Sequence, residues 1–243
     1  MWAVATFQLG RLLSWQRLAL AAIGAVFPAA VMLAAARVSH GALGSDVAVA
    51  MLYALVPEAV CMLGLLLTVC PAVADELERG TWAHVATRPR GRRALILGTW
   101  LAAVIWTGTV ALVALALALV VAGVERPAAV GRIFVVLIVL SCIGRGALFA
   151  VPAVALPRRA LVASVGVALV VEFLAGTIPA VVNQATVSLR LRSLLVDWMG
   201  WRRTLPVEMQ LFVDQRPAWV HVAAVGALAA FLLTRAVGVM ERR

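Results

Sequence analysis

Three ionisable residues, Glu58, Arg145 and Glu172, lie inside long apolar runs of this 243-residue chain. An unpaired charge in the middle of a bilayer costs about 2.5–3.5 kcal/mol on insertion scales, so each of them needs a partner or water. Arg145 and Glu172 lie equally far along the sequence from a turn at 157–159, ~20 Å away in antiparallel helices. We expect an Arg145–Glu172 ion pair that fastens this hairpin. We also expect that exchanging the two charges restores assembly lost in either single variant.

Other roles stay open for these charges. Arg145 can instead meet Glu58, and the three groups can form a proton relay or a polar substrate site. Pro57 stands directly before Glu58 and predicts a kink, because proline removes a backbone donor and leaves a carbonyl that neighbouring helices must satisfy. Such a kink is compatible with gating and with simple packing.

Enzymatic chemistry finds no support in the remaining polar residues. The three histidines lie on different segments without a zinc-protease or triad-like signature, and no two carboxylates lie close together within one apolar run. The three cysteines match no metal-ligand spacing and are expected to be small core residues. We therefore expect a non-catalytic chain with no metal site; these residues are His40, His84, His221, Cys61, Cys70 and Cys142.

All 21 basic residues are arginine. A P-loop needs a lysine to reach the nucleotide phosphates, so this chain cannot contain one. Any ATP hydrolysis linked to this protein must occur on another polypeptide. The net charge of +10 does not indicate nucleic-acid binding, because the arginines flank apolar runs instead of forming a basic patch on a polar domain.

The composition, 64% hydrophobic and 13% charged, indicates a protein whose main solvent is lipid. A helix needs about 20 apolar residues to cross a bilayer, and six runs qualify. We predict an all-α, polytopic membrane protein with one transmembrane domain over 1–243. The predicted spans are 18–36, 49–73, 94–123, 133–156, 160–182 and 219–239.

Six spans place both termini on one side, together with the loop at 75–93 and the turn at 157–159. That side carries 12 arginines against eight on the other, which places both termini in the cytoplasm by the positive-inside rule. Exclusive use of arginine hints at a GC-rich bacterial genome, and hence at the bacterial plasma (inner) membrane.

Two amphipathic segments lie outside the predicted spans. Residues 1–17 place Leu9, Leu12 and Leu13 on one helical face, which predicts a helix in the inner interface. The external segment 183–218 has Leu191, Leu194, Leu195 and Trp198 at helical spacing, with Arg190, Ser193 and Asp197 off that face. This pattern predicts an external interfacial helix between spans five and six; a lid over a substrate exit is the alternative.

The stretch ADELERGTWAHVATRPRGRR, 74–93, carries eight charged residues in an otherwise apolar chain. Gly80 predicts the end of the second span, and Thr81 can cap a short helix over 82–87 that ends before Pro89. This surface exposes both charge signs and Trp82, which suits contact with another protein better than simple linkage.

These residues resemble the membrane subunit of type-2 ABC transporters, whose corresponding loop reads E-x-G-T-(x)7-P-x-x-R. The matches are Glu78, Gly80, Thr81, Pro89 and Arg92, and Val85 stands where the family usually has leucine. A second stretch, 170–195, with Glu172 and Pro179, is similar to the family as well, so about 45 residues match well.

The resemblance implies that the loop is a coupling helix that docks on a cytoplasmic ABC ATPase, with Glu76, Glu78, Thr81, Trp82 and Arg92 at that contact. It also implies a second permease, either another copy or a related chain, in a dimer on two ATPases. ATP and magnesium then belong to the partner, and this chain needs no cofactor of its own.

The leading expectation is a permease that exports a hydrophobic or amphipathic substrate with ATP hydrolysed by the partner. One alternative is mechanical transmission to an extracytoplasmic partner bound at 183–218. Another is an ion-coupled carrier that uses the three intramembrane charges and no ATPase. A structural membrane scaffold is the last.

Overall fold

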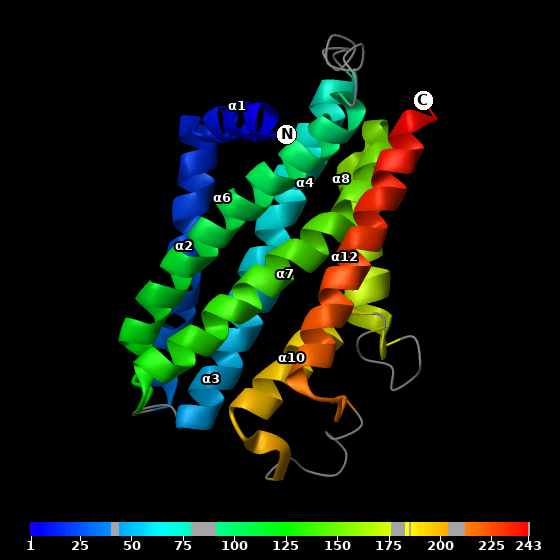
Figure 1. Ribbon diagram of the computed structural model, residues 1–243. Helices are drawn as coiled ribbons and strands as arrows, with labels where there is room; N and C mark the ends of the chain where they lie inside the picture. The colour runs from blue at the N-terminus through cyan, green and yellow to red at the C-terminus, as the bar shows by residue number, and fades with distance from the viewer. Residues whose placement is uncertain (40–43, 79–90, 176–182, 185, 204–211, 243) are drawn as a thin grey trace.

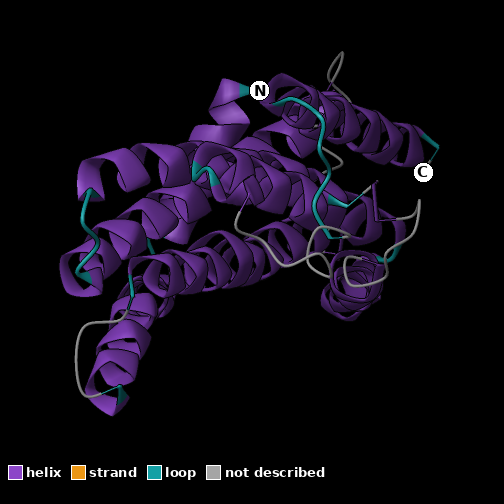
Figure 2. Ribbon diagram, turned by 90° about the horizontal axis from the view of Figure 1, so that it is seen from below, coloured by secondary structure: helices purple, strands orange, loops and turns teal. Residues whose placement is uncertain are grey.

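The computed structural model describes residues 1–39, 44–78, 91–175, 183–184, 186–203 and 212–242. Within these ranges the regular structure is helical, and Figure 2 shows helices and loops but no strand among the described residues. Five helical segments are long and apolar enough to cross a membrane, which is the architecture of a multi-pass membrane protein. They are Trp15–Val38, Ser45–Ala74, Gly91–Ala122, Pro127–Ala155 and Ala218–Glu241.

Each of the five segments covers nearly all of a predicted span and extends beyond it at one end or both. The third, α6 (Gly91–Ala122), ends one residue before the predicted end, because Gly123 has a φ of 62° and cannot continue the helix. The fifth predicted span begins as α8 (Ala160–Val167) and continues to Leu174. Its remainder, 176–182, lies outside the described residues. The crossing by 160–182, which would bring the total to six, therefore stays a prediction.

The N-terminal helix α1 (Trp2–Leu12) lies across one end of the bundle, and α2 (Trp15–Val38) descends from it (Figure 1). The predicted helix is therefore present, but its packing face is Ala5, Gln8 and Leu12, whereas Leu13 is exposed. This face is buried because it carries hydrogen bonds to α4: the Gln8 amide and the Arg11 guanidinium both donate to Glu76, at 3.2 and 2.5 Å. These bonds turn α1 toward the end of α4.

The central helix is α7 (Pro127–Ala155), which packs against α4, α6, α10 and α12. It turns back at Pro157–Arg159, a short 3-10 helix, into α8, as the sequence predicts. The last helix, α12 (Ala218–Glu241), packs along α7 and brings the C-terminus to the same end of the bundle as the N-terminus (Figure 1). Both termini therefore lie at one end, although the side of the membrane is not fixed by this arrangement.

Two helices contain π-helical segments. In the second, α3 (Ser45–Tyr53) passes through η1 (Ala54–Val60) into α4 (Cys61–Glu78). Pro57 lies inside η1 and has no N–H to donate, so the regular i→i−4 pattern fails there, although the predicted kink itself stays a prediction. In the fifth, η3 (Ala168–Leu174) follows α8 and contains Glu172. The two acids expected inside the membrane thus both lie on π-helical segments.

The helix predicted within 183–218 is present as α10 (Val187–Trp198), followed by the short η5 (Trp201–Arg203). Its position relative to the membrane surface stays a prediction, but side chains on more than one of its faces are buried. Leu191 and Leu194 are buried, and so are Arg190 and Ser193 on the opposite face. Its polar face is enclosed because these side chains have partners inside the protein, among them Asp214, whose carboxylate accepts from Arg190 at 2.8 Å.

Candidate functional site

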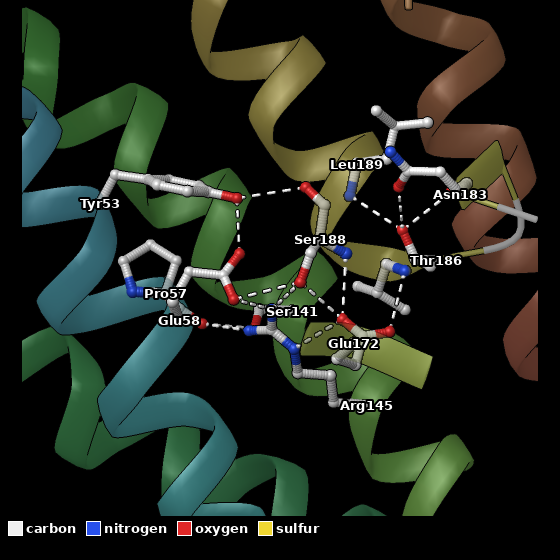
Figure 3. Close-up of polar contacts among 11 residues, drawn as sticks. Tyr53, Pro57, Glu58, Ser141, Arg145, Glu172, Asn183, Thr186, Ser188 and Leu189 are labelled. Carbon is white, nitrogen blue, oxygen red and sulfur yellow. Dashed lines mark hydrogen bonds and ion pairs between the residues drawn. The ribbon is translucent and has the colours of Figure 1, made fainter. Parts of the chain in front are cut away.

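A buried group of polar side chains joins α3–η1, α7, η3 and the start of α10 (Figure 3). We call it the arginine node. It consists of Arg145, Glu58, Glu172, Ser141, Ser188 and Tyr53, together with the backbone carbonyl of Pro57. The Arg145–Glu172 ion pair expected from the sequence is present, with 3.4 Å between Nε and Oε2, and the alternative partner Glu58 is engaged at the same time.

Arg145 uses all five of its N–H groups. Nε donates to Glu172. Nη1 donates to the Pro57 carbonyl at 2.5 Å and to the Ser141 hydroxyl at 2.8 Å. Nη2 donates to Glu58 and, at 2.8 Å, to the Ser188 hydroxyl. A guanidinium has five donors, so this side chain, which is fully buried, has no unsatisfied hydrogen-bonding capacity.

The Pro57 carbonyl, inside the π-helical segment, accepts from two side chains of α7, Arg145 and Ser141. Ser141, one helical turn before Arg145, donates to the same oxygen at 2.8 Å. Glu58 follows directly and accepts from the Tyr53 hydroxyl at 2.6 Å. Side chains of α7 therefore supply hydrogen-bond donors to the backbone where this helix is irregular.

Glu172 binds the N-terminus of α10. Its two carboxylate oxygens accept from the backbone N–H groups of Val187 and Ser188, each at 3.0 Å, and the Ser188 hydroxyl donates at 2.7 Å. Thr186 is the N-cap, and its hydroxyl accepts from the N–H of Leu189 at 3.2 Å. These contacts satisfy three of the first N–H groups of the helix, and the negative charge lies where the helix dipole is positive.

The start of α10 lies close to α7 because position 144 has no side chain. A Cβ at Gly144 would lie 2.9 and 3.2 Å from the two methyl groups of Val187 and 3.2 Å from one of Val225. Real Cβ atoms do not come so close to their neighbours without displacement. The residue before Arg145 therefore sets the distance at which α10 can meet the node.

The two carboxylates of the node are balanced by the Arg145 guanidinium and by the positive end of the α10 dipole. With one guanidinium and two carboxylates ionised, the formal charge is −1. The α10 terminus adds the equivalent of about +0.5 beside Glu172. Glu58 keeps a quarter of its side chain exposed, whereas Glu172 is almost fully buried. The node can thus hold α10 in place, while Glu58 is its accessible acid.

A second polar cluster fixes the other face of α10. Arg190 donates to Asp214 and to the Gln184 carbonyl, and its Nη1 lies 3.4 Å from the His221 ring. The backbone N–H of Asp214 in turn donates to the Ser193 hydroxyl at 2.9 Å. Both faces of α10 are therefore bound by side chains.

The residues expected to contact an ATPase fall mostly outside the described part of the chain. Gly80, Thr81, Trp82, Val85 and Pro89 lie within 79–90, and Glu78 is described only as the last residue of α4. Of the two whose side chains are described, Glu76 is buried against α1. Arg92 donates to the Glu241 carbonyl at 2.7 Å, at the end of α12.

The sequence-based reasoning did not identify Tyr53, Ser141, Ser188 or Thr186 as part of the site. Two signals were available: Tyr53 is the single tyrosine of the chain and lies five residues before Glu58, and a threonine before an apolar-periodic segment is a common N-cap. Nothing in the sequence indicates the contacts of the two serines. Among the described residues, no group of three His, Cys, Asp or Glu side chains is placed to bind a metal ion.

In comparisons with known proteins, no protein-family model and no curated protein matches this chain.

Proposed function

We propose that this chain is the membrane-spanning permease subunit of an ATP-binding cassette transporter, with both termini in the bacterial cytoplasm. In this proposal a separate ATPase binds the loop at 75–93, and a second permease completes the pathway for a hydrophobic or amphipathic substrate. The absence of lysine supports a separate ATPase, because the chain has no residue that can complete a P-loop.

The observation that carries the proposal is the connection between that loop and the arginine node. From Cys61 to Glu78, α4 is one continuous helix, ~27 Å long, and it leads from η1 directly into the loop. A displacement of the loop is transmitted along this helix to Glu58 and the Pro57 carbonyl. Both are bonded to Arg145, which is bonded to Glu172 at the start of α10. ATP-driven movement at one end thus has a mechanical route to a short helix at the other.

The test is purification of the tagged chain in mild detergent from its native membrane, followed by assay of Mg²⁺-dependent ATP hydrolysis in the preparation. We expect activity to co-purify with the natural chain and to fall at least tenfold with Glu78→Arg, because reversing an interface charge costs several kcal/mol. Arg158→Gln, in the turn at the same end, is the matched control and should retain activity. A preparation without any nucleotide-hydrolysing partner contradicts the proposal.

An ion-coupled carrier is the second candidate, favoured by the partial exposure of Glu58 beside a buried arginine. Transport of a fluorescent amphipathic dye into sealed vesicles separates the two. Dependence on ATP supports the permease, whereas uptake that persists without ATP and stops when the proton gradient is collapsed supports the carrier.

A further inference from the structure

An apolar groove of about 330 Å³ runs along the outside of the bundle between α2, α4 and α6. Its floor is the close contact of α4 with α6, where Gly64 lets the Thr107 side chain approach to a distance that any Cβ would obstruct. Its walls carry exposed apolar side chains such as Ile23 and Leu63, which are 66% and 53% exposed. The groove therefore faces the surroundings of the bundle and not its core.

One cation lines the groove. Arg17 stands near the start of α2, partly buried, and has no hydrogen-bond or ion-pair partner in the part of the chain that the structure describes. It lies one half-turn from Trp15, which is 82% exposed at the junction with α1. Exposed tryptophan is typical of the membrane–water interface, so Arg17 lies at headgroup level.

The dimensions of the groove fit one lipid chain. Its lining on α2 extends from Arg17 to Phe27, which is ~15 Å along a helix and about half of a ~30 Å hydrocarbon core. The groove therefore spans one leaflet, on the side of the chain termini.

We propose that this groove is a binding site for one anionic phospholipid, with the phosphate on Arg17 and an acyl chain along α2. A guanidinium binds phosphate oxygens through two parallel hydrogen bonds, and the groove below it is lined mainly by apolar side chains and contains no other charged residue. Transfer of an acyl chain from bulk lipid into the groove brings little hydrophobic gain, because the bilayer is equally apolar. Selectivity must therefore come from the charge on Arg17.

The groove contains its own reporter, since Trp106 lines it. We would reconstitute the full chain in phosphatidylcholine vesicles and add phosphatidylglycerol brominated on its acyl chains, which quenches nearby tryptophan. We expect saturable quenching at a low mole fraction of the anionic lipid, and Trp106→Phe should remove that component. Arg17→Gln should weaken the apparent affinity about fivefold, the equivalent of about 1 kcal/mol for one basic residue at an anionic lipid.

Two matched controls test the assignment. Arg37→Gln changes an exposed arginine at the opposite end of α2 and should leave the quenching unchanged. Ala21→Leu adds volume to the lining and should displace the acyl chain, whereas Ala22→Leu, on the exposed face next to it, should not.

Three results would overturn the proposal. Equal quenching by brominated phosphatidylcholine shows ordinary surrounding lipid. Equal competition by a brominated alkane without phosphate shows a site for apolar cargo. Loss of quenching as the ratio of protein to lipid rises shows that a second copy of the chain covers the groove.

Discussion

Replacing Glu172 by glutamine should release the N-terminus of α10 while leaving the bundle folded. The change keeps the shape of the side chain but leaves one acceptor oxygen where the carboxylate had two. Each of those two oxygens accepts a backbone N–H of α10, from Val187 and from Ser188. The glutamine NH₂ would face one of these N–H groups, donor against donor.

The magnitude follows from these contacts. A buried N–H left without an acceptor costs about 1–3 kcal/mol. Loss of the negative charge at the helix terminus costs up to about 2 kcal/mol in a buried geometry. A total near 3 kcal/mol corresponds to a roughly 150-fold increase in the equilibrium constant for opening of the α10 N-terminus. The effect should stay local, because Arg145 keeps Glu58, Ser141 and the Pro57 carbonyl as partners.

Hydrogen–deuterium exchange of the purified chain, read by mass spectrometry, measures this release directly. Amides of α10 should exchange on the order of 100-fold faster in Glu172→Gln, while peptides from α7 keep their protection. Glu125→Gln, an exposed acid in the loop between α6 and α7, is the matched control and should change neither. Unchanged exchange in α10, or an equal loss of protection in α7, would refute the role assigned to Glu172.

Two further changes test the same site. The exchange variant Arg145→Glu/Glu172→Arg should not recover the yield of folded protein lost in the single variants, because an arginine at 172 would face the N–H donors of α10; recovery in size-exclusion profiles would contradict this geometry. This reverses the expectation drawn from the sequence alone. Gly144→Ala should lower thermal stability by an amount equivalent to about 1–3 kcal/mol, because the added methyl group overlaps Val187. Gly108→Ala, in α6 with nothing within 4 Å of the added methyl, should not destabilise, and equal melting temperatures for the two alanine variants would exclude the proposed close packing.

The helices were predictable because lipid imposes a simple rule on composition and length. Five of the six predicted runs appear as helices long and apolar enough to cross a membrane. The prediction made these helices too short, because each helix continues beyond the apolar run at one end or both. The meeting of Arg145 with Glu172 was predictable for a similar reason. A short turn forces two antiparallel helices into register, so equal distance from the turn gives equal depth.

The partners of α10 were not predictable in this way. Its pattern of leucines on one face and polar residues on the other is the pattern of a helix at an interface. Arg190 and Ser193 find their hydrogen-bond partner in Asp214, more than 20 residues later in the sequence. Whether they meet it also depends on the packing of α7. Contacts over such distances in sequence leave no local periodicity.

The arginine node differs from most buried ion pairs in what it stabilises. Replacing a buried ion pair by apolar residues of similar size is often neutral or even stabilising. Here the charged groups also satisfy backbone atoms: Arg145 donates to the Pro57 carbonyl, and Glu172 accepts from Val187 and Ser188. Apolar substitutes would leave the two N–H groups without acceptors in a medium that offers no water, and would leave the Pro57 carbonyl with the Ser141 hydroxyl as its donor from α7. The charges of the node therefore stabilise two irregular backbone segments that meet inside the bundle.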